Sequence, residues 1–129
     1  MPFLIYNYVN QHGQNEFNEW TWGLEKLQRA KLNERIDKLA IYGDVLYPEM
    51  LAGTSVAGIQ KLKVKGNVQL RPLLCKGPVN IQDEYTLLMG AKEVGSKWVP
   101  KGAPSTAATK KADVIKAPTK RRTKHERVL

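Results

Sequence analysis

The sequence has little of what disulfides, metal centres and membrane spans require. Its single cysteine, Cys75, excludes an intramolecular disulfide and a multi-cysteine metal site. Its two histidines, His12 and His125, lie near opposite ends of the chain and outside any motif with metal-ligand spacing, so we expect no metal and no other cofactor. The apolar runs are far shorter than the roughly 20 residues that cross a bilayer. The first residues carry no basic stretch of the kind that opens a signal peptide. These absences predict a soluble, cytoplasmic protein.

The motifs of several common enzyme classes are also missing. The chain contains no GxGxxG, P-loop, GxSxG or HExxH pattern and no paired-carboxylate constellation. With 129 residues, of which 42% are hydrophobic, it can build one core and is too apolar to be wholly disordered. We predict one domain over residues 1–118 and a basic, flexible tail over residues 119–129.

The positive charge is concentrated in the second half of the chain. The formal net charge is +9, from 21 Lys+Arg and 12 Asp+Glu. Residues 1–60 hold 5 basic and 7 acidic residues (net −2), and residues 61–129 hold 16 and 5 (net +11). This division favours an anionic partner for the second half: nucleic acid, an anionic membrane surface or an acidic protein. The alternative is a solvated basic face with a disordered basic tail.

The first third of the chain reads as a strand followed by helix. Residues 3–9 are rich in β-branched and aromatic types and predict a strand. Asn15 is a suitable N-cap, and apolar residues then recur with helical spacing as far as Gly43, where a glycine suits a helix end. We expect an antiparallel helical pair, or one long helix, over 15–42.

The middle of the chain predicts three strands, which follow a loop over 44–58. They cover residues 59–65, 68–75 and 84–90, and the last is the most apolar and is expected to be central. Pro72 cannot donate a ladder hydrogen bond, so it implies an edge, a bulge or a change of phase.

The last part predicts a polar loop over 91–100 and a helix over 103–116, capped by Ser105 or Thr106 and ended by Pro118. The order of elements predicts an α+β fold: a small antiparallel or mixed sheet of about four strands, with two N-terminal helices and one C-terminal helix packed on it.

A row of lysines is the clearest candidate for binding. Lys61, Lys63 and Lys65 alternate with apolar residues, which places them on one strand face about 6.5–7 Å apart. Such a row could follow the phosphates of a nucleic-acid strand, and Arg71 joins it if the next strand forms a hairpin. Lys76 is a further cation within the domain. The alternative is an ordinary solvated sheet face.

Two other basic groups follow. Lys92, Lys97 and Lys101 flank Trp98, which could stack on a base or instead cover the sheet edge. The tail could neutralise phosphates without sequence preference, or could simply be disordered. Neighbouring cations disfavour protonation of His125 in the tail, and a neutral imidazole could serve as a base. The tail's basic run comprises Lys120, Arg121, Arg122, Lys124, His125 and Arg127.

Several short motifs resemble the RelE/ParE toxin superfamily, and most closely its HigB-like, phage-derived branch. The resemblance covers roughly residues 3–118. The helical hairpin of these toxins is matched by Asn15-Glu-Phe-Asn-Glu-Trp20, Leu24, Leu27, Arg35-Ile36, Leu39-Ala40 and Gly43-Asp-Val-Leu46. The strands and the late basic loop are matched by Gln60-Lys-Leu62, Gln69-Leu-Arg71, Thr86-Leu-Leu-Met-Gly-Ala91, Lys92, Lys97 and Pro100.

This resemblance implies the toxin of a type II toxin–antitoxin system, a sheet cupped by helices whose concave face binds RNA. Family members often cleave mRNA, many of them on the ribosome, through attack of a ribose 2′-OH on the adjacent phosphate. By the same resemblance, Lys61, Lys63, Lys65 and Arg71 clamp the phosphate, and Lys92 and Lys97 hold RNA or the leaving group. Tyr85 and His125 are the candidates for proton transfer. The partners would be RNA and a helix-turn-helix antitoxin, and not a membrane.

The sequence also departs from this family. The frequent Tyr-Arg of the middle strand is absent, and Leu73-Leu-Cys-Lys76 occupies that region. The alternative is therefore a non-catalytic phage or mobile-element protein of the same fold, which binds nucleic acid or a host or virion protein. A third possibility is an inhibitor that binds a host enzyme by surface contacts.

Overall fold

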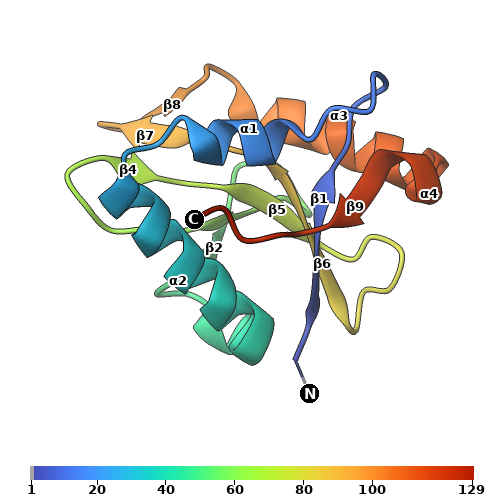
Figure 1. Ribbon diagram of the computed structural model, residues 1–129, viewed down its shortest axis with the longest axis horizontal. Coiled ribbons are helices and arrows are strands. Elements are labelled where there is room, and N and C mark those ends of the chain that lie inside the picture. The colour runs from blue at the N-terminus through green and yellow to red at the C-terminus, as the bar shows by residue number, and fades with distance from the viewer. Residues whose placement is uncertain (1) are drawn as a thin grey trace.

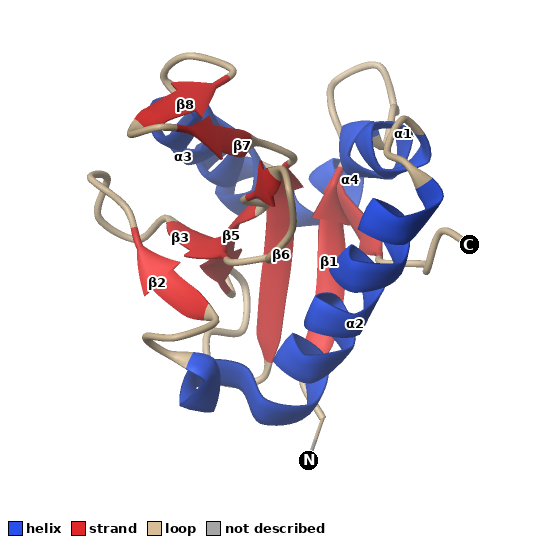
Figure 2. Cartoon of the chain, turned by 90° about the vertical axis from the view of Figure 1, so that its left-hand side faces the viewer, coloured by secondary structure: helices blue, strands red, loops and turns tan. Residues whose placement is uncertain are grey.

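The computed structural model describes residues 2–129, which form an α+β fold. A central sheet lies between two layers of helix, with α1 and α2 on one face and α3 on the other (Figures 1 and 2). The elements in chain order are β1 (Leu4–Tyr8), α1 (Glu16–Trp22), α2 (Lys26–Tyr42), the 3₁₀ helix η1 (Gly43–Leu46), β2 (Leu51–Gly53), β3 (Gln60–Leu62), β4 (Gln69–Leu70), β5 (Leu73–Lys76), β6 (Glu84–Met89), β7 (Lys92–Val94), β8 (Lys97–Val99), α3 (Ala103–Lys116), α4 (Pro118–Arg121) and β9 (Arg122–Lys124).

The central sheet has six strands in the order β2-β3-β5-β6-β1-β9. Strands β1 and β6 are parallel and the other neighbours are antiparallel, so the sheet is mixed. A separate three-stranded sheet has the order β4-β7-β8. The α+β class is confirmed, but the expected arrangement is wrong, because the central sheet has six strands instead of about four and helices cover both of its faces instead of one. The additional strands lie in the segments 44–58 and 91–100, both expected to be loops, and in the tail, and the strand expected over 68–75 is divided into β4 and β5.

The N-terminal predictions agree with the structure. The side chain of Asn15 accepts a hydrogen bond from the backbone N–H of Asn18 at 3.1 Å and caps α1. The helical stretch is divided into α1 and α2, so two helices are confirmed over the single long helix. Gly43 ends α2 with φ +56°, and a Cβ there would lie 2.4 Å from the ring of Phe3, so glycine is required for two reasons.

Pro72 marks the place where the chain changes sheets. It lies between β4 of the three-stranded sheet and β5 of the six-stranded sheet, and the pairing of β5 with β6 shifts register between Leu73 and Leu74, which agrees with the irregularity expected at the proline. Its carbonyl accepts a hydrogen bond from the backbone N–H of Leu62 at 3.0 Å, although its own nitrogen cannot donate. Arg71 is therefore held at the junction of the two sheets.

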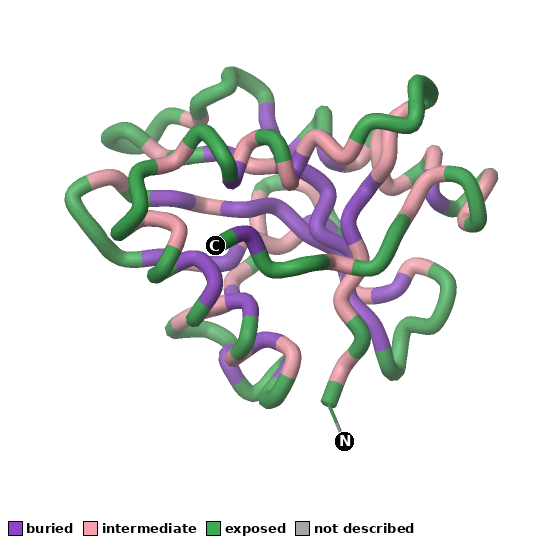
Figure 3. Tube along the Cα trace, viewed as in Figure 1, coloured by how far each residue is buried: buried purple, intermediate pink, exposed green. Residues whose placement is uncertain are grey.

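The core is divided into two parts by the central sheet. Strand β6 is buried at all six positions, as expected for the central strand, and the buried segments gather around it (Figure 3). One part packs Phe17, Leu32 and Leu39 of α1 and α2 against the sheet. The other part packs Ala103 and Ala107 of α3 against the opposite face.

Helix α3 has the predicted range, but its predicted cap is wrong. The N-cap is Gly102, and Pro104 lies in the first turn, where its missing N–H costs nothing. Both Ser105 and Thr106 lie within the helix instead of at its cap.

The segment over 119–129, expected to be a flexible tail, has a packed position instead. Strand β9 pairs with β1, and Val128 is buried with 4% of its surface exposed (Figure 1). Ion pairs join Arg122 to Glu84 and Arg127 to Asp37. Two of the basic residues in this segment, Arg122 and Arg127, therefore have acidic partners, which charge counting along the chain did not reveal.

Among residues 2–129, no helix combines the length and the apolar character needed to span a bilayer.

Candidate nucleic-acid interface

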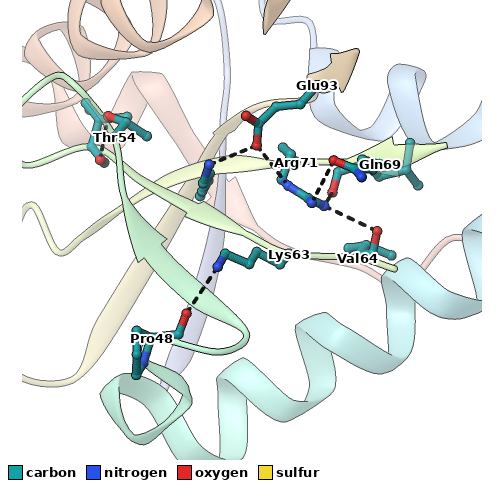
Figure 4. Close-up of polar contacts among 10 residues, drawn as sticks. Pro48, Thr54, Lys63, Val64, Gln69, Arg71 and Glu93 are labelled. Atoms are coloured by element: carbon teal, nitrogen blue, oxygen red, sulfur yellow. Dashed lines mark hydrogen bonds and ion pairs between the residues drawn. The ribbon is translucent and has the colours of Figure 1, made fainter. Parts of the chain in front are cut away.

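The carboxylate of Glu93 joins two of the cations that the sequence predicts to bind phosphate. The Nζ of Lys61 lies 2.8 Å from Glu93 Oε1, and the Nε of Arg71 lies 3.0 Å from the same oxygen. Figure 4 shows Arg71 reaching Glu93 across the junction of the two sheets. The ammonium of Lys61 also lies 5.5 Å from the ring centroid of Trp98. We call Lys61, Arg71, Glu93 and Trp98 the Glu93 cluster.

Strand pairing explains how residues distant in sequence meet here. Gln69 of β4 lies opposite Glu93 of β7, and Arg71 follows two residues later, where its backbone N–H bonds to the carbonyl of Ala91 at 2.8 Å. Glu93 in turn lies opposite Trp98 of β8, so the carboxylate and the indole are cross-strand neighbours. The β7–β8 hairpin therefore carries both groups to Lys61 on β3.

The guanidinium of Arg71 is held by several acceptors. It donates to the carbonyl of Leu70 at 2.9 Å, to Gln69 Oε1 at 3.2 Å and to the carbonyl of Val64 at 3.4 Å (Figure 4). Its side chain is 12% exposed. These bonds fix the direction of the guanidinium, so it is a positioned cation and not a mobile surface charge.

The charges of the cluster keep its carboxylate ionised. Burial alone would raise the pKa of Glu93, but hydrogen bonds and charge from Lys61 and Arg71 outweigh burial and lower the pKa below its usual value. At neutral pH the three side chains carry a net charge of +1.

Arg35 of α2 adds a cation that the search for basic motifs missed. Its guanidinium bonds to the carbonyl of Lys63, and its Nε is buried without a partner in the described chain. Burial lowers the pKa of Arg35, and the neighbouring charge of Arg71 lowers it further. In the sequence, Arg35 was only a single arginine within the predicted helix. The structure shows its role because it places the backbone that follows β3 within reach of the guanidinium.

The three lysines of the predicted row do not act alike. Burial alternates as expected, with Leu62 and Val64 in the core. Lys61 pairs with Glu93, while Lys63 donates to the carbonyl of Pro48 at 3.3 Å (Figure 4). Lys65 is exposed.

Lys92 and Lys97 are exposed, but they adjoin Glu93 and Trp98 along their strands. Because alternate residues of a strand face opposite sides, these two lysines lie on the outer face of the hairpin, away from the cluster. Lys76 pairs with Asp44 at 2.6 Å, outside the Glu93 cluster. Arg121 is the last residue of α4, and Arg122 is the first residue of β9.

Of the two candidates for proton transfer, Tyr85 is buried and His125 is half-buried. Tyr85 has no exposed surface and donates to Asp44 Oδ1, and its pKa is raised by burial and by that carboxylate. His125 packs against Phe17, and burial lowers its pKa to about 4. Neither side chain lies in the Glu93 cluster, so neither reaches a substrate bound at that surface.

Cys75 is fully buried, and burial raises the pKa of its thiol to about 12, which agrees with its expected place in the core. Within the described part of the chain, no three His, Cys, Asp or Glu side chains are placed to hold a metal ion together. No protein-family model matches the sequence, and no curated protein or solved structure is significantly similar to it.

The cluster brings together three chemical capacities. Glu93 is a proton acceptor, Lys61 and Arg71 can stabilise negative charge on a phosphate, and Trp98 has a ring on which a base can stack. Together these are the groups that binding and transesterification of a phosphodiester require.

Proposed function

We propose that this protein is an endoribonuclease toxin of the RelE/ParE kind that binds and cleaves RNA at the Glu93 cluster. The observation that carries the proposal is a single carboxylate held between a lysine and an arginine beside an indole ring. The resemblance to this superfamily supports it through the helical pair after the first strand and the basic segment over 61–65, whose first residues belong to β3. The proposed substrate is cytoplasmic mRNA, and the proposed partner is an antitoxin whose acidic segment covers the cluster.

In the proposed reaction, Glu93 accepts the proton of a ribose 2′-OH. The 2′ oxygen attacks the adjacent phosphorus, the bond to the 5′ oxygen breaks, and the products are a 2′,3′-cyclic phosphate and a 5′-OH. Arg71 and Lys61 stabilise the charge that develops on the phosphate. Water supplies the proton to the leaving 5′ oxygen, and protonated Glu93 gives its proton to the hydroxide that forms.

Substrate binding also improves Glu93 as a base. In the free protein its pKa is lowered by Lys61 and Arg71. A bound phosphate competes for the same donors, so the carboxylate loses part of their stabilisation and its pKa rises. The ion pairs of the free protein thus hold the two cations in place until RNA replaces the carboxylate as their partner.

A second function, RNA binding without cleavage, is favoured by one observation. Tyr85 and His125, the side chains that the resemblance implies for proton transfer, lie outside the Glu93 cluster, and Tyr85 is fully buried while His125 is half-buried. In this alternative, Glu93 only orients the two cations.

The test is cleavage of labelled RNA, with and without translating ribosomes, by the wild type, Glu93→Gln and the control Lys116→Gln. Lys116 is exposed at the far end of α3, about 20 Å along the helix from its start beside β8. We expect Glu93→Gln to lose about 10²–10⁴-fold in rate, as is typical of a lost general base. Glu93→Gln should bind RNA at least as tightly as the wild type does, because Lys61 and Arg71 are no longer neutralised by a carboxylate.

Each other outcome is decisive. Unchanged cleavage by Glu93→Gln excludes the carboxylate as the base. Salt-sensitive binding of RNA by a wild type that never cleaves it, on or off the ribosome, establishes the binding module instead.

A further inference from the structure

A second site lies at the ends of β2, β3 and β5, where a cavity of about 570 Å³ opens. Its volume falls within the range of small-molecule sites. None of the four residues of the Glu93 cluster lines it. The residues that matter to the argument are Tyr47, Thr54, Gly58, Lys76 and Lys111, and we call this space the Lys111 cavity.

One wall is a preorganised glycine-containing loop over 53–58, with the sequence Gly-Thr-Ser-Val-Ala-Gly. The hydroxyl of Thr54 donates to the carbonyl of Ile59 at 2.8 Å and accepts from the backbone N–H of Val56 at 3.2 Å. The backbone N–H groups of Thr54 and Ile59 are bonded within the loop as well. The loop therefore keeps its shape without help from neighbouring elements.

The opposite wall of the cavity carries a cation, the ammonium of Lys111, close to the loop. The Nζ of Lys111, on α3, lies 2.7 Å from the point that a Cβ at position 58 would occupy. Gly58 has φ +80°, and this backbone conformation is what favours glycine there. Any side chain at this position would displace the ammonium from the loop.

Lys111 has no counter-charge of its own. It is half-buried, and it makes no ion pair or side-chain hydrogen bond with any residue from 2 to 129. Its neighbour Lys110, by contrast, pairs with Glu16 at 2.5 Å. Lys76 also lines the cavity and pairs with Asp44 at 2.6 Å, so the cavity holds two cations and one carboxylate.

We infer that the Lys111 cavity binds a phosphate group, with the Lys111 ammonium as its main partner and Lys76 as the second. An anion would supply the hydrogen-bond acceptor and the counter-charge that the half-buried ammonium of Lys111 lacks. Glycine at position 58 allows that anion to approach the backbone of the loop closely. Tyr47, which is 59% exposed, adds a ring at the cavity wall. The phosphate could belong to a mononucleotide or to an RNA chain, and both present the same chemistry to Lys111.

The test is titration calorimetry with inorganic phosphate, adenosine monophosphate and a short single-stranded RNA. The variants are Lys111→Gln, Lys111→Arg and the control Lys116→Gln, which removes an equally basic residue five positions along the same helix. We expect phosphate affinity to fall about tenfold or more in Lys111→Gln, as for the loss of one hydrogen bond to a charged group. Lys111→Arg and Lys116→Gln should bind as the wild type does.

The probes separate the two sources of phosphate. Tighter binding of the mononucleotide than of inorganic phosphate identifies a nucleotide site. Tighter binding of RNA than of both, weakened in Lys111→Gln, identifies an extension of an RNA path through the cavity. No phosphate binding by the wild type at millimolar concentrations, or equal binding by Lys111→Gln, overturns the inference. Glu93→Gln should retain phosphate binding in the cavity, so failure at one site is distinguishable from failure at the other.

Gly58→Ala supplies a second, independent variant. It keeps the lysine but should displace its ammonium and so weaken phosphate binding. If Gly58→Ala retained wild-type phosphate affinity, the close approach of loop and ammonium would have no role in binding.

Discussion

The side-chain amide of Asn33 donates a hydrogen bond of 2.8 Å to the backbone carbonyl of Val128. The bond joins the middle of α2 to the last turn of the chain, and both residues are buried. A buried carbonyl without a donor is costly, so the C-terminal residues gain a fixed position from a single helix side chain. The basic end of this chain is in that way attached to the same helix that packs the core.

Replacement of Asn33 by Ala should therefore lower the free energy of unfolding by about 1–3 kcal/mol, because it leaves the carbonyl of Val128 buried and unpaired. Urea denaturation measures the change. Asn67→Ala, which removes an amide from an exposed loop position, is the control and should have little effect. Equal unfolding midpoints for the two variants would contradict the role of this bond.

His125 should make stability depend on pH. Its Nδ1 lies 2.9 Å from Asn7 Oδ1, and burial lowers its pKa from 6.5 to about 4, with Asp37 opposing the shift. Between these values the unfolded chain binds a proton that the folded chain does not. The stability present above about pH 6.5 should thus fall as the pH falls towards 4, by on the order of 3 kcal/mol.

Urea denaturation at pH 7 and pH 4.5 measures this effect. His125→Gln should have a smaller loss of stability between the two pH values than the wild type, since other acidic groups contribute equally to both. His12→Gln changes the exposed histidine and should lose as much stability as the wild type. An identical loss in His125→Gln would show that His125 is not the titrating group.

The sequence predicted elements whose signals are local. The apolar run at 84–90, the alanine-rich helix over 103–116 and the proline at 72 each specify their structure through their own residue types. The strands β7, β8 and β9 were missed because they are short and polar, and their stability comes from pairing: β7 with β4, β8 with β7, and β9 with β1.

The candidate site was predicted only in part, for the same reason. Lys61 and Arg71 were identified from their spacing and charge, but Glu93 lay in a segment expected to be a loop and had no pattern to distinguish it. Tyr85 and His125 were chosen from the resemblance; the apolar run at 84–90 indicated that Tyr85 is buried, whereas nothing along the chain indicated that His125 packs against Phe17. Side-chain chemistry can be read along the chain, whereas burial and cross-strand partners depend on topology.

Gly90 should tolerate no side chain. A Cβ at this position would lie 1.8 Å from the ring of Trp20, which packs against the core. Gly90→Ala must therefore displace the indole or the strand end and should cost about 1–3 kcal/mol or more. Thermal or urea unfolding measures the cost, and Gly53→Ala is the matched control, because nothing lies within 4 Å of a Cβ there. A Gly90→Ala protein as stable as Gly53→Ala would mean that Trp20 can move away without loss.

Trp98 should contribute to RNA affinity through its ring. Lys61 holds one side of the indole at 5.5 Å, and the residue is partly exposed, so an unstacked base can reach it. Trp98→Ala should weaken binding of single-stranded RNA by about 1–3 kcal/mol, the usual value for one base stacked on an aromatic side chain.

Trp22→Ala is the matched control, because the guanidinium of Arg29 lies over the Trp22 ring at 5.6 Å and that residue belongs to α1, outside the Glu93 cluster. Fluorescence anisotropy with a short labelled RNA compares the two variants. Equal losses of RNA affinity would mean that both tryptophans serve only the fold. A loss of affinity confined to Trp98→Ala would place the RNA bases on the hairpin that carries Glu93. Binding measured at two salt concentrations completes the argument, because stacking should leave the salt dependence unchanged while loss of Lys61 should reduce it.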